Sequence, residues 1–166
     1  MTDGTVVWIT GLPSAGKSTF AALALSALRE RAVPVCVLDG DAVRASLVPA
    51  PGYDEAGRRD FYETLARLAA TLATQGLVVL VPATAHRRAF RERARELAAR
   101  YVEVLVDTPL AECAARDTKG LYARSQSGEV TQVPGAGAAY ERPTAPDLVA
   151  AGGSDPRALA ALLARL

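Results

Sequence analysis

The sequence has few of the residues from which disulfide frameworks, metal centres and histidine-based active sites are built. Its 166 residues include two cysteines, one histidine, one methionine and one tryptophan. Cys36 and Cys113 lie far apart in apolar stretches, so they predict neither a disulfide framework nor a zinc site. We interpret both as buried thiols of a reducing compartment. His86 stands alone in a loop, where a structural or solvent-facing role is more common than a catalytic one.

The sequence also lacks a marked net charge and any long apolar run. Charged residues make up 22% of the chain and nearly cancel, to +1, which gives no electrostatic reason to expect nucleic acid or a membrane as a partner. No run approaches the roughly 20 apolar residues of a membrane span. An apolar strand pattern begins within a few residues of Met1, which leaves no room for a signal peptide. We therefore expect a cytoplasmic globular protein that forms one domain over residues 1–166.

A glycine-rich loop is the most informative feature of the chain. Residues 11–18 follow the pattern G-x-x-x-x-G-K-S, which is typical of phosphate-binding loops. An apolar strand pattern over residues 6–10 precedes the loop, and a helical pattern from about Lys17 to Arg31 follows it, as the motif requires. A glycine-rich turn without a ligand is the alternative interpretation. The predicted nucleotide-binding residues are Gly11, Pro13, Ser14, Ala15, Gly16, Lys17, Ser18 and Thr19.

The residue types of this loop explain how it would hold a triphosphate. Gly11 and Gly16 allow the backbone to curl until consecutive N–H groups point inward and form an anion site. The N-terminal end of the following helix adds a positive partial charge. The Lys17 ammonium is expected on the β- and γ-phosphates, and the Ser18 hydroxyl on Mg²⁺. The loop thus predicts a nucleoside triphosphate and Mg²⁺ as ligands.

Apolar strand patterns and amphipathic helical patterns alternate along most of the chain. This order predicts an α/β protein with a P-loop three-layer fold, in which helices cover both faces of a parallel sheet of about five strands. Leu68 is expected on the inner face of one helix, and Trp8 and Phe20 in the core. Periodicity disappears over residues 117–147, where Gly, Pro, Ser and Thr accumulate, so we expect a lid loop there. The remaining expected strands cover residues 35–38, 77–81, 101–106 and 148–150, and the remaining helices cover about 43–47, 56–75, 87–100, 109–116 and 157–166.

Two aspartates follow the second expected strand. The carboxyl ends of parallel strands line the ligand crevice of an open α/β sheet, so Asp39 and Asp41 are predicted to lie near the phosphates. One carboxylate can hold Mg²⁺ through water, and we favour Asp41 as the group that accepts the proton of an attacking hydroxyl. In a purely structural interpretation Asp39 is a turn residue and Asp41 caps the next helix, and both interpretations can hold together. Arg44 lies one turn further on the same face and is predicted to bind an anionic acceptor.

Several segments of the chain together resemble the adenylylsulfate kinase family. No N-K-x-D segment, with which GTPases read guanine, is present. Instead, GLPSAGKST at residues 11–19 is combined with LDGDAVR at 38–44, CAARDTKGLY at 113–122 and YERPTAPDL at 140–148. Their order and spacing agree with the family from about residue 6 to residue 150. The resemblance implies an ATP-dependent kinase that phosphorylates the 3′-hydroxyl of adenosine 5′-phosphosulfate, with Mg²⁺ as cofactor.

The resemblance also implies roles for single residues. Asp41 matches the catalytic aspartate of the family and is expected to carry the chemistry together with Lys17. Arg116 matches the residue that lies against the ATP base, and Arg91 matches an arginine expected to face the site. Family members commonly pair, so a homodimer is also an expectation. The residues expected to contact the acceptor are Asp39, Asp41, Arg44, Tyr53, Arg58 and Phe61, together with Lys119 and Leu121 of the lid.

The departures from the family fall on the acceptor side. Phe61 stands where the family usually has asparagine, and Ala85 replaces a serine. Val133 and Gly137 replace an aromatic residue and an aspartate of the lid, and an aromatic clamp reduced to one face loses about 1–3 kcal/mol of base stacking. Adenylylsulfate is the first expectation for the acceptor, and another hydroxyl-bearing nucleotide or a small metabolite of a specialised pathway is the alternative. A non-catalytic nucleotide-binding regulatory domain is a second alternative.

Overall fold

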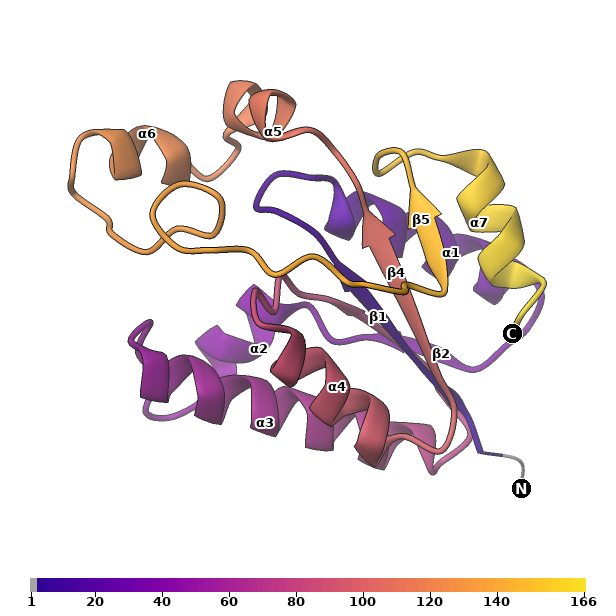
Figure 1. Cartoon of the computed structure of the whole chain (residues 1–166). Helices are drawn as coiled ribbons and strands as arrows, with labels where there is room; N and C mark the ends of the chain where they lie inside the picture. Colours follow the sequence, from indigo (N-terminus) through magenta and orange to yellow (C-terminus); the bar gives the residue numbers. More distant parts are fainter. Residues whose placement is uncertain (1–2) are drawn as a thin grey trace.

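The computed structural model describes residues 3–166 and is built on one five-stranded sheet covered by helices (Figure 1). All strand pairs are parallel, and the order across the sheet is β2-β3-β1-β4-β5. The number of strands, their parallel pairing and the helices on both faces confirm the predicted α/β architecture. The strands are β1 (Thr5–Thr10), β2 (Val35–Val37), β3 (Val78–Pro82), β4 (Tyr101–Val106) and β5 (Leu148–Ala150).

The central strand β1 separates two hydrophobic cores. It pairs with β3 on one side and β4 on the other, and all six of its residues are buried. Its side chains alternate between the two sheet faces, so Val7 and Ile9 belong to one core, and Val6 and Trp8 to the other. Burial on both faces explains why this strand reads as an unbroken apolar pattern. Trp8 and Phe20 are fully buried, which confirms their predicted place in the core.

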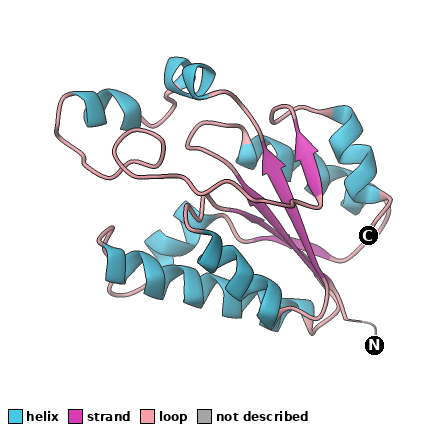
Figure 2. Ribbon diagram, viewed as in Figure 1, coloured by secondary structure: helices cyan, strands magenta, loops and turns pink. Residues whose placement is uncertain are grey.

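Helices α1 and α7 pack on one face of the sheet, and α3 and α4 pack on the other (Figures 1 and 2). This arrangement leaves the carboxyl ends of the strands open to the loops and short helices that form the candidate site. None of the helices in residues 3–166 is long and apolar enough to cross a membrane. The helices are α1 (Lys17–Glu30), α2 (Gly40–Ser46), α3 (Glu55–Ala73), α4 (Arg88–Leu97), α5 (Leu110–Arg116), α6 (Leu121–Gln126) and α7 (Pro156–Leu163).

Two details of the core differ from the sequence-based expectation. The buried stripe of α3 advances in steps of four residues from Phe61 to Ala73. This stripe leaves Leu68 on the flank of the helix with 40% of its surface exposed, so its predicted inward position is wrong. Cys113 is buried as predicted, whereas Cys36 is only half-buried because it lies in the short edge strand β2.

The predicted lid, residues 117–147, contains a helix that the sequence pattern did not indicate. Helix α6 begins after Gly120, whose φ is 65°, and it has only six residues, too few to show a helical periodicity. The Asp117 carboxylate accepts hydrogen bonds from the N–H groups of Tyr122 and Ala123 and so caps this helix. The segment beyond α6 is formed mostly by loops and turns, as expected (Figure 2).

Candidate active site

The phosphate-binding loop connects β1 to α1 at the carboxyl edge of the sheet. Gly16 has a φ of 104°, and a Cβ atom there would come within 2.8 Å of the Gly153 backbone. A Cβ atom at Gly11 would come within 2.7 Å of the Val106 carbonyl oxygen. Both positions therefore require glycine. Because α1 begins at Lys17, its first N–H groups lie at the end of this loop and are available to an anion.

The Lys17 side chain folds back over its own loop. Its Nζ donates hydrogen bonds to the carbonyl oxygens of Gly11 at 3.0 Å and Leu12 at 2.7 Å. Burial, assisted by the positive charge of Lys119, lowers the pKa of this ammonium to about 8. A cation in this position lies beside the N–H groups that are predicted to hold phosphate.

Two oxygen-bearing side chains meet between α1 and the end of β2. The Ser18 hydroxyl donates a hydrogen bond to Oδ2 of Asp39 at 3.2 Å. Oδ1 of Asp39 accepts from the N–H groups of Asp41 and Ala42 and caps α2. Asp39, not Asp41, is therefore the N-cap, which corrects the structural interpretation of this pair. A hydroxyl and a carboxylate fit the few protein oxygens that Mg²⁺ takes besides phosphates and water, and residues 3–166 hold no group of three His, Cys, Asp or Glu side chains suited to a metal.

The Asp41 side chain points from the first turn of α2 toward the lid. Its carboxylate forms an ion pair with the Lys119 ammonium, and both side chains are more than half exposed. Lys17 lies near enough for the charges of Lys119, Asp41 and Asp39 to act on its pKa. Two cations and two carboxylates from three different segments therefore meet at the end of the phosphate-binding loop.

The lid lies directly on the phosphate-binding loop. The Tyr122 hydroxyl donates to the Pro13 carbonyl oxygen at 2.8 Å, and the hydroxyls of Ser14 and Thr118 are 3.1 Å apart. Leu121, expected at the acceptor, instead packs partly buried against the core cluster that contains Val7. The lid thus contacts the loop through polar side chains, and Lys119 is the lid residue that contacts an expected catalytic group.

Arg44 lies beneath the open side of the site, between two aromatic residues. Its guanidinium carbon is 4.4 Å from the Tyr53 ring centroid and 4.0 Å from the Phe61 ring centroid. Tyr53 is 63% exposed, so its side chain is open to solvent on the side not covered by Arg44. Phe61 is only 3% exposed, so its ring contacts Arg44 and the core, not the open site.

Arg58 connects α3 to the lid. Its Nη2 donates a hydrogen bond to the Gln132 carbonyl oxygen at 2.9 Å. Burial lowers the pKa of Arg58, and the neighbouring positive charge of Arg44 lowers it as well. Two like charges held this close favour an anion between or beside them. Val133, the next lid residue, is 3% exposed and packs in the core, where it offers no face for stacking.

Arg116 lines a hollow beside the end of the phosphate-binding loop. The hollow lies between the start of α1, with Gly16 and Thr19, and residues 151–157 after β5. Arg116 is held by an ion pair with Glu112 at 3.4 Å. The structure therefore places Arg116 and Thr19 beside the loop. Ala15, also predicted there, is buried, and its carbonyl oxygen accepts from Thr108 at 2.6 Å.

Buried polar groups hold the loop between β3 and α4 in place. The Ala85 N–H donates to the Tyr62 hydroxyl at 3.1 Å. His86 is buried, and desolvation lowers its pKa to about 4, so it is neutral at pH 7. Arg91 is 2% exposed and pairs with Glu103 of β4 at 2.9 Å, so the expectation that it faces the site is wrong. Arg91 lies in the core, where its Nη1 also donates a hydrogen bond to the Ala85 carbonyl oxygen.

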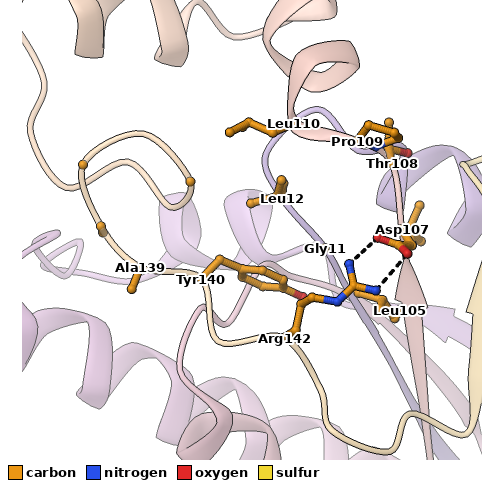
Figure 3. A pocket seen from close by; sticks show the side chains of 14 residues that line it. Gly11, Leu12, Leu105, Asp107, Thr108, Pro109, Leu110, Ala139, Tyr140 and Arg142 are labelled. Carbon is orange, nitrogen blue, oxygen red and sulfur yellow. Dashed lines mark hydrogen bonds and ion pairs between the residues drawn. The ribbon is translucent and has the colours of Figure 1, made fainter.

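A second hollow opens between the start of the loop, the end of β4 and the returning lid (Figure 3). Of the predicted site residues only Gly11 lines it. Arg142 forms a two-armed ion pair with Asp107 at 2.5 and 2.8 Å, drawn as dashed lines in Figure 3. The Tyr140 hydroxyl is 2.9 Å from the Thr10 hydroxyl. These two connections were not predicted from the sequence, because the YERP segment indicated a family resemblance but not its partners on other strands.

Comparison with known proteins gives matches over most of the chain. The family model described as adenylylsulphate kinase matches residues 3–151. The chain is 40% identical over 148 residues to the adenylyl-sulfate kinase of Yersinia pestis, which covers 88% of this chain and 70% of that protein. It is 41% identical over 149 residues to the adenylyl-sulfate kinase of Citrobacter koseri, covering 87% of this chain and 73% of that protein.

A solved structure is similar over the same extent. The Mycobacterium tuberculosis APS kinase CysC, in complex with AMPPNP and APS, matches with a TM-score of 0.92 and 37% sequence identity, covering 99% of this chain and 98% of that one. This similarity includes the parallel sheet and the P-loop kinase fold predicted from the sequence. On these matches, the chain belongs to the adenylylsulphate kinase family.

Proposed function

We propose that the protein transfers the γ-phosphoryl group of ATP to the 3′-hydroxyl of adenosine 5′-phosphosulfate. The observation that supports this most directly is the contact between Asp41 and Lys119 at the end of the phosphate-binding loop. It brings a proton-accepting carboxylate and a second cation to the place where the γ-phosphate of a bound nucleotide is expected. The structure related to this chain at 37% identity contains AMPPNP and APS, a nucleotide and the acceptor in question.

The residues of the site have separate roles in an in-line phosphoryl transfer. The Asp41 carboxylate accepts the proton of the acceptor hydroxyl, whose oxygen forms a bond to the γ-phosphorus while the bond to the bridging oxygen of ADP breaks. Lys17 and the loop N–H groups stabilise the negative charge on the phosphoryl oxygens. The hydroxyl would take the place of Lys119 on Asp41, which would free this ammonium to bind those oxygens.

Ser18 and Asp39 would hold Mg²⁺, whose charge offsets that of the β- and γ-phosphates when it is bound. The base of ATP would occupy the hollow beside Arg116 and Thr19. The lid contacts of Tyr122 and Ser14 would keep water away from the phosphoryl group while both substrates are present.

The acceptor side supports an anionic nucleotide. Arg44 and Arg58 supply two neighbouring positive charges, and the exposed ring of Tyr53 supplies a face on which a base can stack. Because Val133 is buried, the base would be stacked on one side only. A different hydroxyl-bearing nucleotide or small metabolite is therefore the second candidate acceptor. The cytoplasmic location, the single domain and the homodimer stay predictions.

An acceptor panel tests the proposal. ADP release from ATP is measured with adenylylsulfate, AMP, other nucleotides and small alcohols, each at equal concentration and with Mg²⁺ present. We expect adenylylsulfate to give the highest kcat/KM, with the phosphate on the 3′-oxygen of the product. Faster turnover with another compound would select the second candidate. Nucleotide binding without ADP release for any acceptor would instead support a non-catalytic regulatory domain.

A further inference from the structure

The Arg44 guanidinium lies against two aromatic rings. It lies 4.0 Å from the Phe61 ring centroid and 4.4 Å from the Tyr53 ring centroid, and Arg44 is only 7% exposed. Attraction between a cation and an aromatic face is strongest when water is excluded. Phe61 is the buried member of this group, so its contact is the less hydrated of the two.

Phe61 is itself fixed by a row of aromatic side chains. Its ring packs edge-on against Tyr62, with centroids 5.2 Å apart, and Tyr62 stacks on Phe90 of α4 at 4.8 Å. The Tyr62 hydroxyl accepts the hydrogen bond from the N–H of Ala85. The ring beneath Arg44 therefore has little freedom to turn, because the row spans from α3 to α4.

The hydrogen bonds of Arg44 leave part of its guanidinium free. Nη1 donates to the carbonyl oxygens of Pro51 and Gly52, both at 3.0 Å. Within residues 3–166, the Nε and Nη2 groups of Arg44 donate no hydrogen bond, and neither is a buried atom without a partner. One edge of the guanidinium is thus fixed by the backbone, its face is fixed by Phe61, and its other donors are available to an anion.

We propose that Phe61 is a positioning residue, which holds Arg44 in place as a preformed binding group for the anionic part of the acceptor. This inference rests on the proposed function, since Arg44 is placed there on the acceptor side. An arginine that is ordered before binding loses less conformational entropy when the anion arrives. Phe61 therefore acts on acceptor affinity through Arg44, although its own ring does not reach the open site.

Three substitutions separate this role from simple core packing. Phe61→Leu removes the aromatic face but keeps an apolar side chain, and Phe61→Tyr restores the face. Phe90→Leu is the matched control, because it shortens the same aromatic row without touching Arg44. Steady-state kinetics give KM for adenylylsulfate and for ATP. ¹H–¹⁵N spectra give the Nε–H signal of Arg44, which we expect the ring currents of the neighbouring aromatic side chains to shift upfield in the parent protein.

We expect Phe61→Leu to raise KM for adenylylsulfate about tenfold, with KM for ATP changed by less than about twofold. Phe61→Tyr and Phe90→Leu should leave acceptor KM near that of the parent. An acceptor KM that is unchanged in Phe61→Leu, or raised equally in Phe90→Leu, would overturn the positioning role. If the parent itself does not use adenylylsulfate, the proposed function fails. The positioning of Arg44 is then decided by its Nε–H signal, which must move downfield in Phe61→Leu but not in Phe90→Leu.

Discussion

On the donor side of the site, phosphate is expected to meet backbone N–H groups of residues 11–18, whereas the acceptor side presents the side chains of Arg44, Tyr53 and Arg58. The donor side depends on two glycines whose neighbours leave no room for a Cβ atom. The acceptor side depends on side-chain packing that extends back into the core through Phe61.

This difference explains which substitutions a protein with this site can tolerate. A site made of backbone groups fails when its glycines change, because the loop can no longer adopt the required path. A site made of side chains can exchange one packing partner for another, as with Phe61 beneath Arg44. Variation on the acceptor side is therefore expected to change affinity and selectivity more readily than it abolishes nucleotide binding.

Asp41, which lies between the two sides, offers the test with the largest expected effect. Asp41→Asn keeps the shape of the side chain but removes the proton acceptor and the ion pair with Lys119. We expect kcat to fall about 10²–10⁴-fold, while the Kd for ATP measured by calorimetry changes by less than about threefold. Asp60→Asn, which removes an exposed carboxylate of α3 paired with Arg59, should leave both values unchanged. Full activity in Asp41→Asn would contradict the catalytic assignment.

Arg91 offers the next test, because it supports the acceptor side from within the core. Its ion pair with Glu103 is 2% and 10% exposed, so removing Arg91 leaves this buried carboxylate with the half-exposed Arg95, 3.8 Å away, as its ion-pair partner among residues 3–166. We expect Arg91→Met to lower the free energy of unfolding by about 3–5 kcal/mol, measured by urea denaturation. Arg88→Met, in the half-exposed first turn of α4, should cost less than about 0.5 kcal/mol. Equal losses of unfolding free energy in the two variants would show that burial of the Arg91 ion pair does not determine its contribution to stability.

The sheet and the phosphate-binding loop could be predicted from the sequence, whereas several side-chain contacts of the site could not. The five-stranded parallel sheet and the donor loop were predicted correctly, because periodicity and glycine spacing are local in the sequence. The burial of Arg91 and the contact of Phe61 with Arg44 were not predicted, because they depend on which side chains of different elements pack together. Helix α6 was missed because two turns capped by Asp117 leave no periodic pattern. Local sequence motifs identify a site, whereas tertiary packing decides whether each side chain faces the site or the core.

A pH profile sharpens the description of the donor side. The pKa of Lys17 is lowered to about 8 by burial, so above pH 8 the free protein loses a charge that must be restored when ATP binds. We expect the Kd for ATP to be flat between pH 7 and 8 and then to rise by up to about tenfold per pH unit. Lys17→Arg, whose charge does not titrate in this range, should bind with a flat profile. A slope in Lys17→Arg equal to that of the parent would assign the titration to another group.

His86 tests the acceptor side through stability. Its pKa is about 4 in the folded protein and 6.5 in the unfolded chain, so the unfolded chain binds more protons between these values. The free energy of unfolding should therefore fall as pH decreases from 7 to 5, by about 1–2 kcal/mol from this group. Other groups contribute to acid sensitivity as well, since Asp107 and Asp155 have lowered pKa values through hydrogen bonds. The measurement is consequently a difference: urea denaturation of His86→Gln at both pH values should show a smaller loss than the parent, and an equal loss would mean that the buried imidazole takes up no proton on unfolding.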